Sequence, residues 1–129
     1  MRLLLDTHVL LWALGNPAKL PAAARLVILD PANEVLFSAA SIWEIAIKLE
    51  LGRADFAASP EEIARAAVES GIEELPVRAQ HAALTAQLPR HHRDPFDRLL
   101  VAQAMAEPAR LLTVDEALRP YSELVVVLR

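Results

Sequence analysis

Four acidic residues of the sequence stand where they could act together in chemistry. Asp6 interrupts the apolar run "LLLDTHVLLW", Glu44 lies in "SAASIWEIAIKLELG", Asp97 lies in "HRDPFDRLL", and Asp115 follows "LLTV". A carboxylate is costly to bury unless a partner compensates for its charge, and clustered carboxylates repel one another. Carboxylate oxygens without thiolates suit Mg²⁺ or Mn²⁺. The chemistry that such a site favours is hydrolysis of phosphodiester bonds.

Each of these acids also has a simpler explanation as a helix cap. The spacing of Ser41 and Glu44 matches a capping box. Asp97 lies in an acidic first turn that follows Asp94 and a proline, and this order is typical of a helix start with Asp94 as its cap. Asp6 and Asp115 could cap the helices that follow them. The apolar flanks of Asp6 and Glu44 nevertheless favour a shared site, because a cap needs no such flanks.

Short apolar strands that alternate with helices must position these residues. The pattern predicts strands at 2–5, 34–37, 72–77, 110–114 and 124–128, and helices at 7–14, 21–30, 39–51, 60–70, 78–88, 96–107 and 116–120. This alternation implies an α/β fold, a three-layer α/β/α sandwich with a mostly parallel sheet of four or five strands. Such sheets bind ligands beyond the carboxyl ends of their strands. The four acids fall at that edge, at strand ends or in the first turns of helices.

Composition limits the class of protein. The length of 129 residues predicts one domain over 1–129. A net charge of −4 argues against a broad basic face for nucleic acid, so any such contact must be local or mediated by a cation. The absence of cysteine excludes disulfides and thiolate metal sites and fits a cytoplasmic protein. No apolar run approaches the roughly 18 residues of a membrane span, so we expect no membrane association. The hydrophobic content of 54% predicts apolar surface covered by a partner.

The most basic stretch of the chain directly precedes the acidic helix. It consists of Arg90, His91, His92 and Arg93. These residues could bind RNA phosphates beside the acids, or they could form a solvated loop. Histidine is a poor ligand in a site of hard oxygen donors, so neither histidine is expected to bind the cation.

Three further side chains are expected to support the site. The hydroxyls of Thr7 and Thr113 could orient Asp6 and Asp115, because each threonine is adjacent or nearly adjacent to one of these acids. Arg98 follows Asp97 and could pair with a neighbouring acid or with substrate.

Four segments together resemble the PIN-domain ribonucleases, and most closely the VapC-type toxins of bacterial type II toxin–antitoxin pairs. They are "LLLDTHVLLWAL", "SAASIWEIAIKLELG", "HHRDPFDRLLVAQA" and "LLTVDEAL", and the resemblance covers about residues 2–128. It implies a Rossmann-like PIN fold and an Mg²⁺-dependent endoribonuclease, in which Mn²⁺ can substitute. Asp6, Glu44, Asp97 and Asp115 match the acidic quartet of the family, and Asp94 is interpreted as a cap that supports it.

The resemblance also implies a homodimer and a small antitoxin that wraps the toxin and blocks the acidic pocket, giving a toxin–antitoxin hetero-oligomer. Helix 39–51 is apolar around much of its circumference, so it is either an ordinary buried helix or one with a second face toward a partner.

Two other functions stay open. One is a non-catalytic α/β binding module whose acids only cap helices. The other is a phosphotransfer or phosphatase domain with Asp6 as nucleophile, which usually needs a second acid beside the first.

Overall fold

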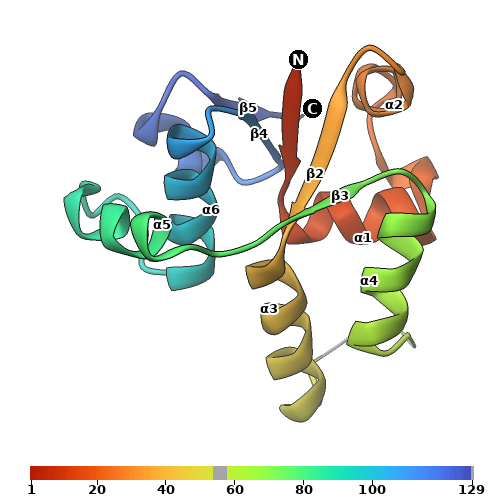
Figure 1. Ribbon diagram of the computed structural model, residues 1–129, viewed down its shortest axis with the longest axis horizontal. Helices are drawn as coiled ribbons and strands as arrows, with labels where there is room; N and C mark the ends of the chain where they lie inside the picture. Colours follow the sequence, from red (N-terminus) through yellow and green to blue (C-terminus); the bar gives the residue numbers. More distant parts are fainter. Residues whose placement is uncertain (54–57, 129) are drawn as a thin grey trace.

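The computed structural model describes residues 1–53 and 58–128, which form a parallel five-stranded sheet covered by helices (Figure 1). The strands are β1 (Arg2–Leu5), β2 (Glu34–Ser38), β3 (Glu73–Leu75), β4 (Arg110–Thr113) and β5 (Val125–Val127). The helices are α1 (Thr7–Gly15), α2 (Ala22–Leu29), α3 (Ala39–Glu50), α4 (Pro60–Glu69), α5 (Ala79–Leu84) and α6 (Pro95–Ala106), with 3₁₀ helices at Pro17–Lys19, Thr85–Gln87 and Glu116–Tyr121. The predicted α/β architecture is confirmed.

Alternation along the strands divides the core into two layers. Leu3 and Leu5 of β1 point to one face, where they pack with residues of α1, α3 and α4. Leu4 points to the other face and packs against residues of α6, including Leu100. Successive side chains of a strand lie on opposite faces, so an uninterrupted apolar run is what a strand covered on both sides requires. Figure 1 shows α5 and α6 on the opposite side of the sheet from α1, α2 and α4.

The strand order β3-β2-β1-β4-β5 creates a switch point at the centre of the sheet. The chain proceeds from β1 to β2 and β3 on one side, then returns to place β4 and β5 on the other. The backbone N–H of Asp6 donates to the carbonyl of Leu112 at 3.0 Å, so the carboxyl ends of β1 and β4 adjoin. Open α/β sheets bind ligands in the crevice at this position.

Three local predictions differ from the structure. The predicted helix 78–88 is split into α5 and the 3₁₀ turn Thr85–Gln87, where the Thr85 hydroxyl donates to the Ala82 carbonyl at 2.6 Å. The predicted helix 116–120 is a 3₁₀ helix with Pro120 inside it. The predicted capping box of Ser41 and Glu44 is wrong, because α3 begins directly after β2 and Ser38 caps it through the N–H of Ala40. Among the helices that the structure describes, none combines the length and the apolar character needed to cross a membrane.

Candidate active site

The carboxyl edge of the sheet holds a small acidic hollow of about 230 Å³. It lies where β1 and β4 end and where α3 and α6 begin. The structure brings all of the predicted acids to it, together with two basic side chains. The lining residues are Asp6, Thr7, His8, Glu44, Lys48, Asp94, Asp97, Val114 and Asp115.

Asp6 serves as a helix cap and as a wall of this hollow. Its Oδ1 accepts the backbone N–H of Val9 at 2.8 Å, which caps α1. Its Oδ2 accepts the Thr113 hydroxyl at 2.5 Å, and that hydroxyl oxygen accepts the backbone N–H of Asp115 at 3.0 Å. Thr113 therefore ties the end of β1 to the end of β4, through the carboxylate of Asp6 and the backbone N–H of Asp115. Capping and membership of a shared site are thus compatible, because the two carboxylate oxygens have different partners.

Glu44 also lines the hollow and is held by two neighbours that were not among its predicted partners. The Thr7 hydroxyl donates to Glu44 Oε1 at 2.7 Å and lies 2.9 Å from the hydroxyl of Ser41. Lys48, one turn further along α3, places its Nζ 2.8 Å from Glu44 Oε2. Thr7 thus orients Glu44 and not Asp6 or Asp115. The spacing of Glu44 and Lys48 is the i,i+4 pair that stabilises helices, and that signal was available in the sequence.

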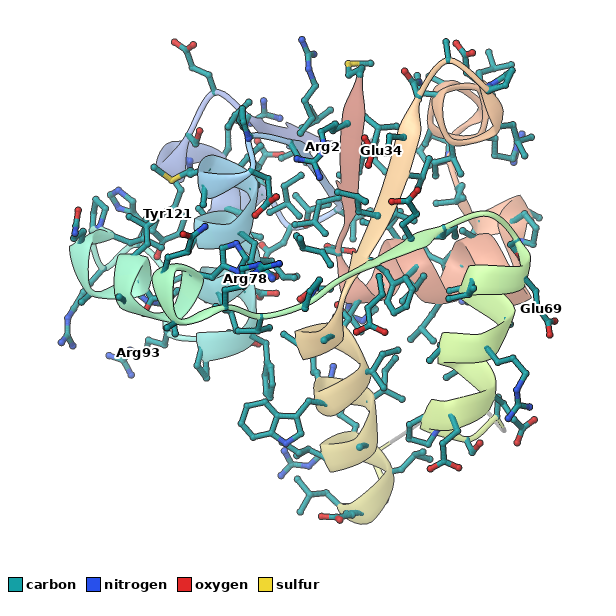
Figure 2. All side chains as sticks on the ribbon, viewed as in Figure 1. Arg2, Glu34, Glu69, Arg78, Arg93 and Tyr121 are labelled. Atoms are coloured by element: carbon teal, nitrogen blue, oxygen red, sulfur yellow. The ribbon has the colours of Figure 1, made fainter. Side chains whose placement is uncertain are left out.

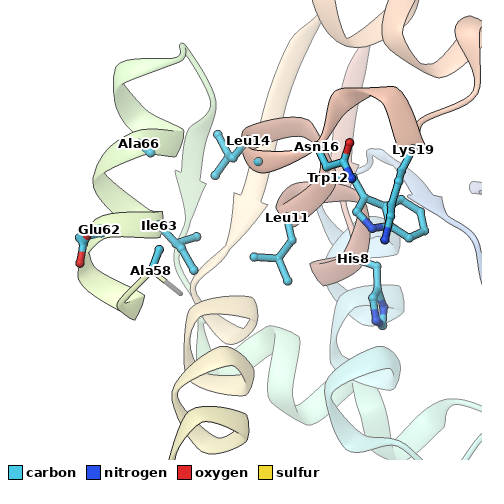
Figure 3. A pocket seen from close by; sticks show the side chains of 11 residues that line it. His8, Leu11, Trp12, Leu14, Asn16, Lys19, Ala58, Glu62, Ile63 and Ala66 are labelled. Atoms are coloured by element: carbon cyan, nitrogen blue, oxygen red, sulfur yellow. The ribbon is translucent and has the colours of Figure 1, made fainter. Parts of the chain in front are cut away.

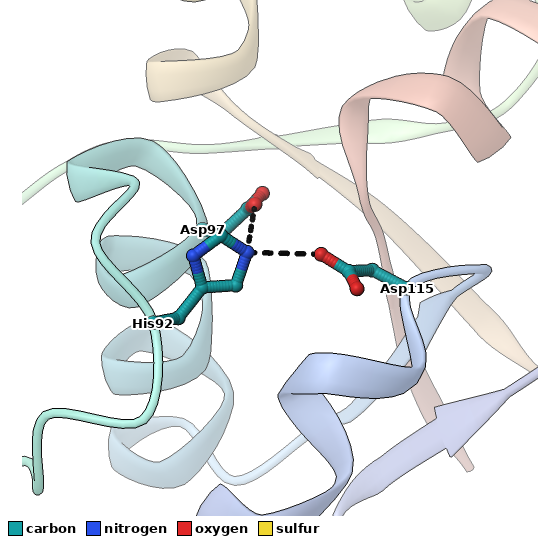
Figure 4. A group of neighbouring side chains, drawn as sticks. All are labelled: His92, Asp97 and Asp115. Carbon is teal, nitrogen blue, oxygen red and sulfur yellow. Dashed lines mark hydrogen bonds and ion pairs between the residues drawn. The ribbon is translucent and has the colours of Figure 1, made fainter.

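Asp97 and Asp115 meet at the side chain of His92 (Figure 4). The Nε2 atom of His92 lies 2.9 Å from Asp115 Oδ2 and 3.3 Å from Asp97 Oδ2. Asp94 caps α6 by accepting the N–H groups of Phe96 at 2.8 Å and Asp97 at 3.4 Å, as predicted. Ligand atoms of His92, Asp97 and Asp115 all lie within 4.8 Å of one another, close enough to surround one ion.

The hollow disfavours the ionised form of two of its acids, Asp6 and Asp97. Burial raises the pKa of Asp6, even though Thr113 and the Val9 N–H favour its ionised form. Burial and, next, repulsion from the carboxylates of Asp94, Glu44 and Asp6 raise the pKa of Asp97 to about 7. Opposite charge nearby would reverse these shifts. A cluster of oxygen donors without thiolates is what Mg²⁺ or Mn²⁺ binds, so these residues fit a divalent cation.

The basic stretch borders a second hollow of about 570 Å³, lined by Arg90, His92, Arg93 and Arg98. Figure 2 shows Arg93 at the outer surface, directed away from the sheet. Because His92 reaches the acids and also lines this hollow, the basic and acidic hollows are neighbours. His91 stays outside both linings and packs edge-on against Tyr121, with ring centroids 5.0 Å apart.

Arg98 does not pair with an acid in the described part of the chain, and the alternative that it contacts substrate stays a prediction. In the described part of the chain its hydrogen bonds go to the Tyr121 hydroxyl at 3.2 Å and to the main-chain carbonyls of Thr85, Leu88 and Pro89 at 2.8–3.4 Å, and none goes to an acid. Arg98 therefore fastens the loop before α6. A guanidinium has five donors in a rigid fork, which suits this task of joining several carbonyls.

A third hollow, of about 490 Å³, lies between α1 and α4 (Figure 3). Its walls are formed largely by apolar side chains such as Leu11, Trp12 and Ile63, with Lys19 and Glu62 at its margin. His8 lines both this hollow and the acidic one. The single carboxylate among its lining residues gives it no cluster for acid–base or cation chemistry, so the acidic hollow is the candidate active site.

Comparison with known proteins agrees with this geometry. Residues 3–124 match the family model of the PIN domain. The chain belongs to the PIN-domain family. It is 34% identical over 122 residues to Ribonuclease VapC22 of Mycobacterium tuberculosis, a match that covers 92% of this chain and 90% of that protein. The resemblance to VapC-type PIN ribonucleases that the sequence motifs indicated is thereby confirmed.

The fold of this PIN domain is also found in a solved complex. The crystal structure of VapBC2 from Rickettsia felis, bound to a DNA fragment from their promoter, matches with a TM-score of 0.69 at 17% sequence identity. The match covers 98% of this chain and 97% of the other. At this identity the likeness shows the PIN fold alone, and it extends over the whole sheet and its helices.

Proposed function

We propose that this VapC-type ribonuclease hydrolyses RNA phosphodiester bonds at the acidic hollow and acts as the toxin of a toxin–antitoxin pair. The observation that carries the proposal is the convergence of Asp6, Glu44, Asp97 and Asp115 in one hollow of about 230 Å³. These carboxylates come from four separate segments of the chain, so their meeting is not a by-product of local sequence. Membership of a ribonuclease family supports a nuclease over a non-catalytic binding module or an aspartyl-phosphate enzyme.

The four carboxylates are proposed to hold Mg²⁺, with Mn²⁺ as a substitute. When bound, a divalent cation supplies Lewis-acid polarisation of the phosphoryl oxygens and lowers the pKa of water. Asp6 and Asp97 are proposed as the main ligands, since burial first, and then repulsion from neighbouring carboxylates, raises the pKa of both. Glu44, fixed by Thr7 and Lys48, is proposed to orient the cation or the attacking water.

The basic hollow is proposed to bind the RNA backbone next to the cleaved bond. Arg90 and Arg93 line it beside the acids and supply fixed positive charge, and arginine binds phosphate through paired donors. This local arrangement explains how a chain with a net charge of −4 could bind RNA without a broad basic face. Sequence preference is then left to groups that contact the bases. An RNA substrate implies a cytoplasmic location, which stays a prediction.

A small antitoxin and a second copy of the chain are proposed as protein partners. Several large apolar side chains are exposed, among them Leu26 at 72%, Leu29 at 78% and Trp43 at 62%. Trp43 packs edge-on against Phe96, with ring centroids 5.1 Å apart, and each ring directly precedes an acid of the hollow, Glu44 or Asp97. Exposed apolar surface of this kind marks protein interfaces, and the VapBC2 match is to a chain solved in such a complex.

The test is cleavage of structured RNAs by purified protein. Wild type is expected to cleave with Mg²⁺ and to lose activity with EDTA, while Asp6→Asn and Asp97→Asn lose it with Mg²⁺ present. Glu69→Gln, an exposed position on α4 far from the hollow, is the matched control for loss of one carboxylate and should cleave like wild type (Figure 2). Activity that survives EDTA, or that the two aspartate substitutions leave intact, would overturn the proposal.

A further inference from the structure

His92 is fixed on every side although it lies in the loop before α6. Its backbone N–H donates to the Tyr121 hydroxyl at 2.8 Å. Its ring Nδ1 accepts the backbone N–H of Asp94 at 3.1 Å. Its ring Nε2 faces Asp115 Oδ2 at 2.9 Å and Asp97 Oδ2 at 3.3 Å (Figure 4). The imidazole is thus aimed at the two carboxylates by its main chain and by its other ring nitrogen.

Distances alone permit two roles for this ring. On an octahedral ion with bonds of about 2.1 Å, two neighbouring ligand atoms lie about 3 Å apart. The separations of 2.9 Å and 3.3 Å from Nε2 to the carboxylate oxygens fit that spacing. The 2.9 Å separation from Asp115 Oδ2 fits a hydrogen bond from the ring equally well, with Asp97 Oδ2 in ion-pair range at 3.3 Å. His92 could therefore be a cation ligand beside Asp97 and Asp115, or a donor that holds them.

The hydrogen bond at Nδ1 distinguishes these roles. A ring nitrogen that accepts a backbone N–H carries no proton, so in the neutral ring the proton is on Nε2. A protonated Nε2 has no lone pair to offer a cation. Histidines that bind metals instead donate from the second ring nitrogen to an acceptor, and Asp94 presents His92 with a donor. The local backbone therefore sets the tautomer that is wrong for coordination and right for donation to carboxylates.

His81 shows the same arrangement elsewhere in the fold. Its Nδ1 accepts the backbone N–H of Arg78 at 3.0 Å, and its Nε2 lies 2.7 Å from Glu107 Oε2. That histidine is fully buried and lies outside the residues that line the acidic hollow. Among the described residues, two histidines thus accept a backbone N–H at Nδ1 and leave Nε2–H to bind a carboxylate.

We propose that His92 is a positioning residue for the ribonuclease reaction: its Nε2–H donates to Asp115 and holds that carboxylate beside Asp97, while the ring stays outside the coordination sphere of the cation. The inference rests on the proposed cation site. Two carboxylates that must share one ion repel each other before it binds, and an N–H group that donates to one and lies close to the other reduces that repulsion. His92 also forms the boundary between the acidic hollow and the basic hollow, so it fixes the acids relative to the proposed phosphate contacts.

The test uses Mn²⁺ as a paramagnetic probe of the full chain. Electron spin echo modulation of bound Mn²⁺ detects a directly coordinated imidazole nitrogen, and titration followed by the signal of free Mn²⁺ gives the affinity. The variants are His92→Gln, which keeps an N–H donor near the position of Nε2, and His92→Leu, which removes it. His91→Leu is the control, because the neighbouring ring contacts neither acid. Thermal unfolding verifies that each variant is folded.

We expect wild type to bind Mn²⁺ without coupling from a coordinated nitrogen. Loss of such a supporting hydrogen bond typically weakens metal binding about 10–100-fold, so His92→Leu should bind Mn²⁺ more weakly by that factor. His92→Gln and His91→Leu should stay close to wild type. Strong nitrogen coupling in wild type would overturn the inference and make His92 a ligand. Unchanged affinity in folded His92→Leu would overturn it as well. Failure of wild type to bind Mn²⁺ at all is a different result, since it would remove the proposed cation site together with this inference.

Discussion

Replacing Asp97 by asparagine should stabilise the metal-free protein, although the same change should abolish activity. Burial and the carboxylates of Asp94, Glu44 and Asp6 raise the pKa of Asp97 from 3.8 to about 7. The ionised side chain of Asp97 therefore destabilises the folded state when no cation is present. Asparagine keeps an oxygen acceptor for His92 and removes the charge.

The magnitude follows from the pKa. Each pKa unit corresponds to about 1.4 kcal/mol, so a change from 3.8 to about 7 gives an upper limit of about 4 kcal/mol. The Asp97 side chain is 21% exposed, and water screens part of the repulsion, so we expect about 2 kcal/mol. For a domain of this length that is a rise in Tm of roughly 8 °C, at roughly 4 °C per kcal/mol.

The stabilisation by Asp97→Asn should depend on pH, because the pKa of Asp97 is raised in the folded state. Because the folded-state pKa of Asp97 lies above the unfolded value, wild type loses stability as the pH rises from about 4 to about 7. Asp97→Asn has no such loss. The advantage of the variant should thus be small near pH 4, grow across this window and be constant above it.

The assay is thermal or urea unfolding of both proteins in EDTA at a series of pH values. Glu69→Gln is the control, because Glu69 is exposed and lies far from the acidic hollow (Figure 2). This change should leave the free energy of unfolding nearly unaltered. An Asp97→Asn variant that is no more stable than wild type at pH 8 in EDTA would refute the claim that like charges are crowded at this site.

Three other measurements test the same physical picture. Mg²⁺ at 100 times its Kd should add about 2.7 kcal/mol to the unfolding free energy of wild type and much less to that of Asp97→Asn, and equal gains in both proteins would contradict the assigned ligand. Thr113→Val removes the hydroxyl between Asp6 and the N–H of Asp115 and should cost about 1–3 kcal/mol in urea unfolding, so an unchanged midpoint would count against this link. The pKa of Glu107 is lowered chiefly by its hydrogen bond to His81, so its carboxylate stabilises the fold above the ordinary pKa of 4.5. Glu107→Gln should therefore have a lower free energy of unfolding than wild type at pH 7. This deficit should shrink as the pH falls below 4.5. A deficit that is the same at pH 4 and pH 7 would contradict that account.

The fold was predictable because its strands are short apolar runs and its helices have clear ends. The run 2–5 is observed as β1 with its predicted bounds, and helix 39–51 is observed as α3 with one residue fewer. Gly52 follows α3 with a φ of 67°, a conformation that glycine adopts readily. The proximity of the acids followed from the rule that parallel strands present their carboxyl ends at one edge.

The finer contacts of the site were not predictable, because they join segments that are distant in the sequence. Ser38 precedes α3 and Ser41 lies in its first turn. Ser38 is the cap because β2 passes directly into α3. Ser41 is thereby free to contact Thr7, which is 34 positions away. The direction of His92 depends on Tyr121, 29 positions away, so no local pattern could reveal that its ring reaches the acids.

The central claim is that this chain cuts RNA with the carboxylates of the acidic hollow, and sequencing of RNA ends tests it most directly. Total RNA is incubated with Mg²⁺ and either wild type or Asp6→Asn, and the new ends are mapped in both samples. Discrete ends should appear with wild type and be absent with Asp6→Asn. The same ends at the same abundance in both samples would assign the cleavage to a contaminating nuclease and would rule out the acidic hollow as its source.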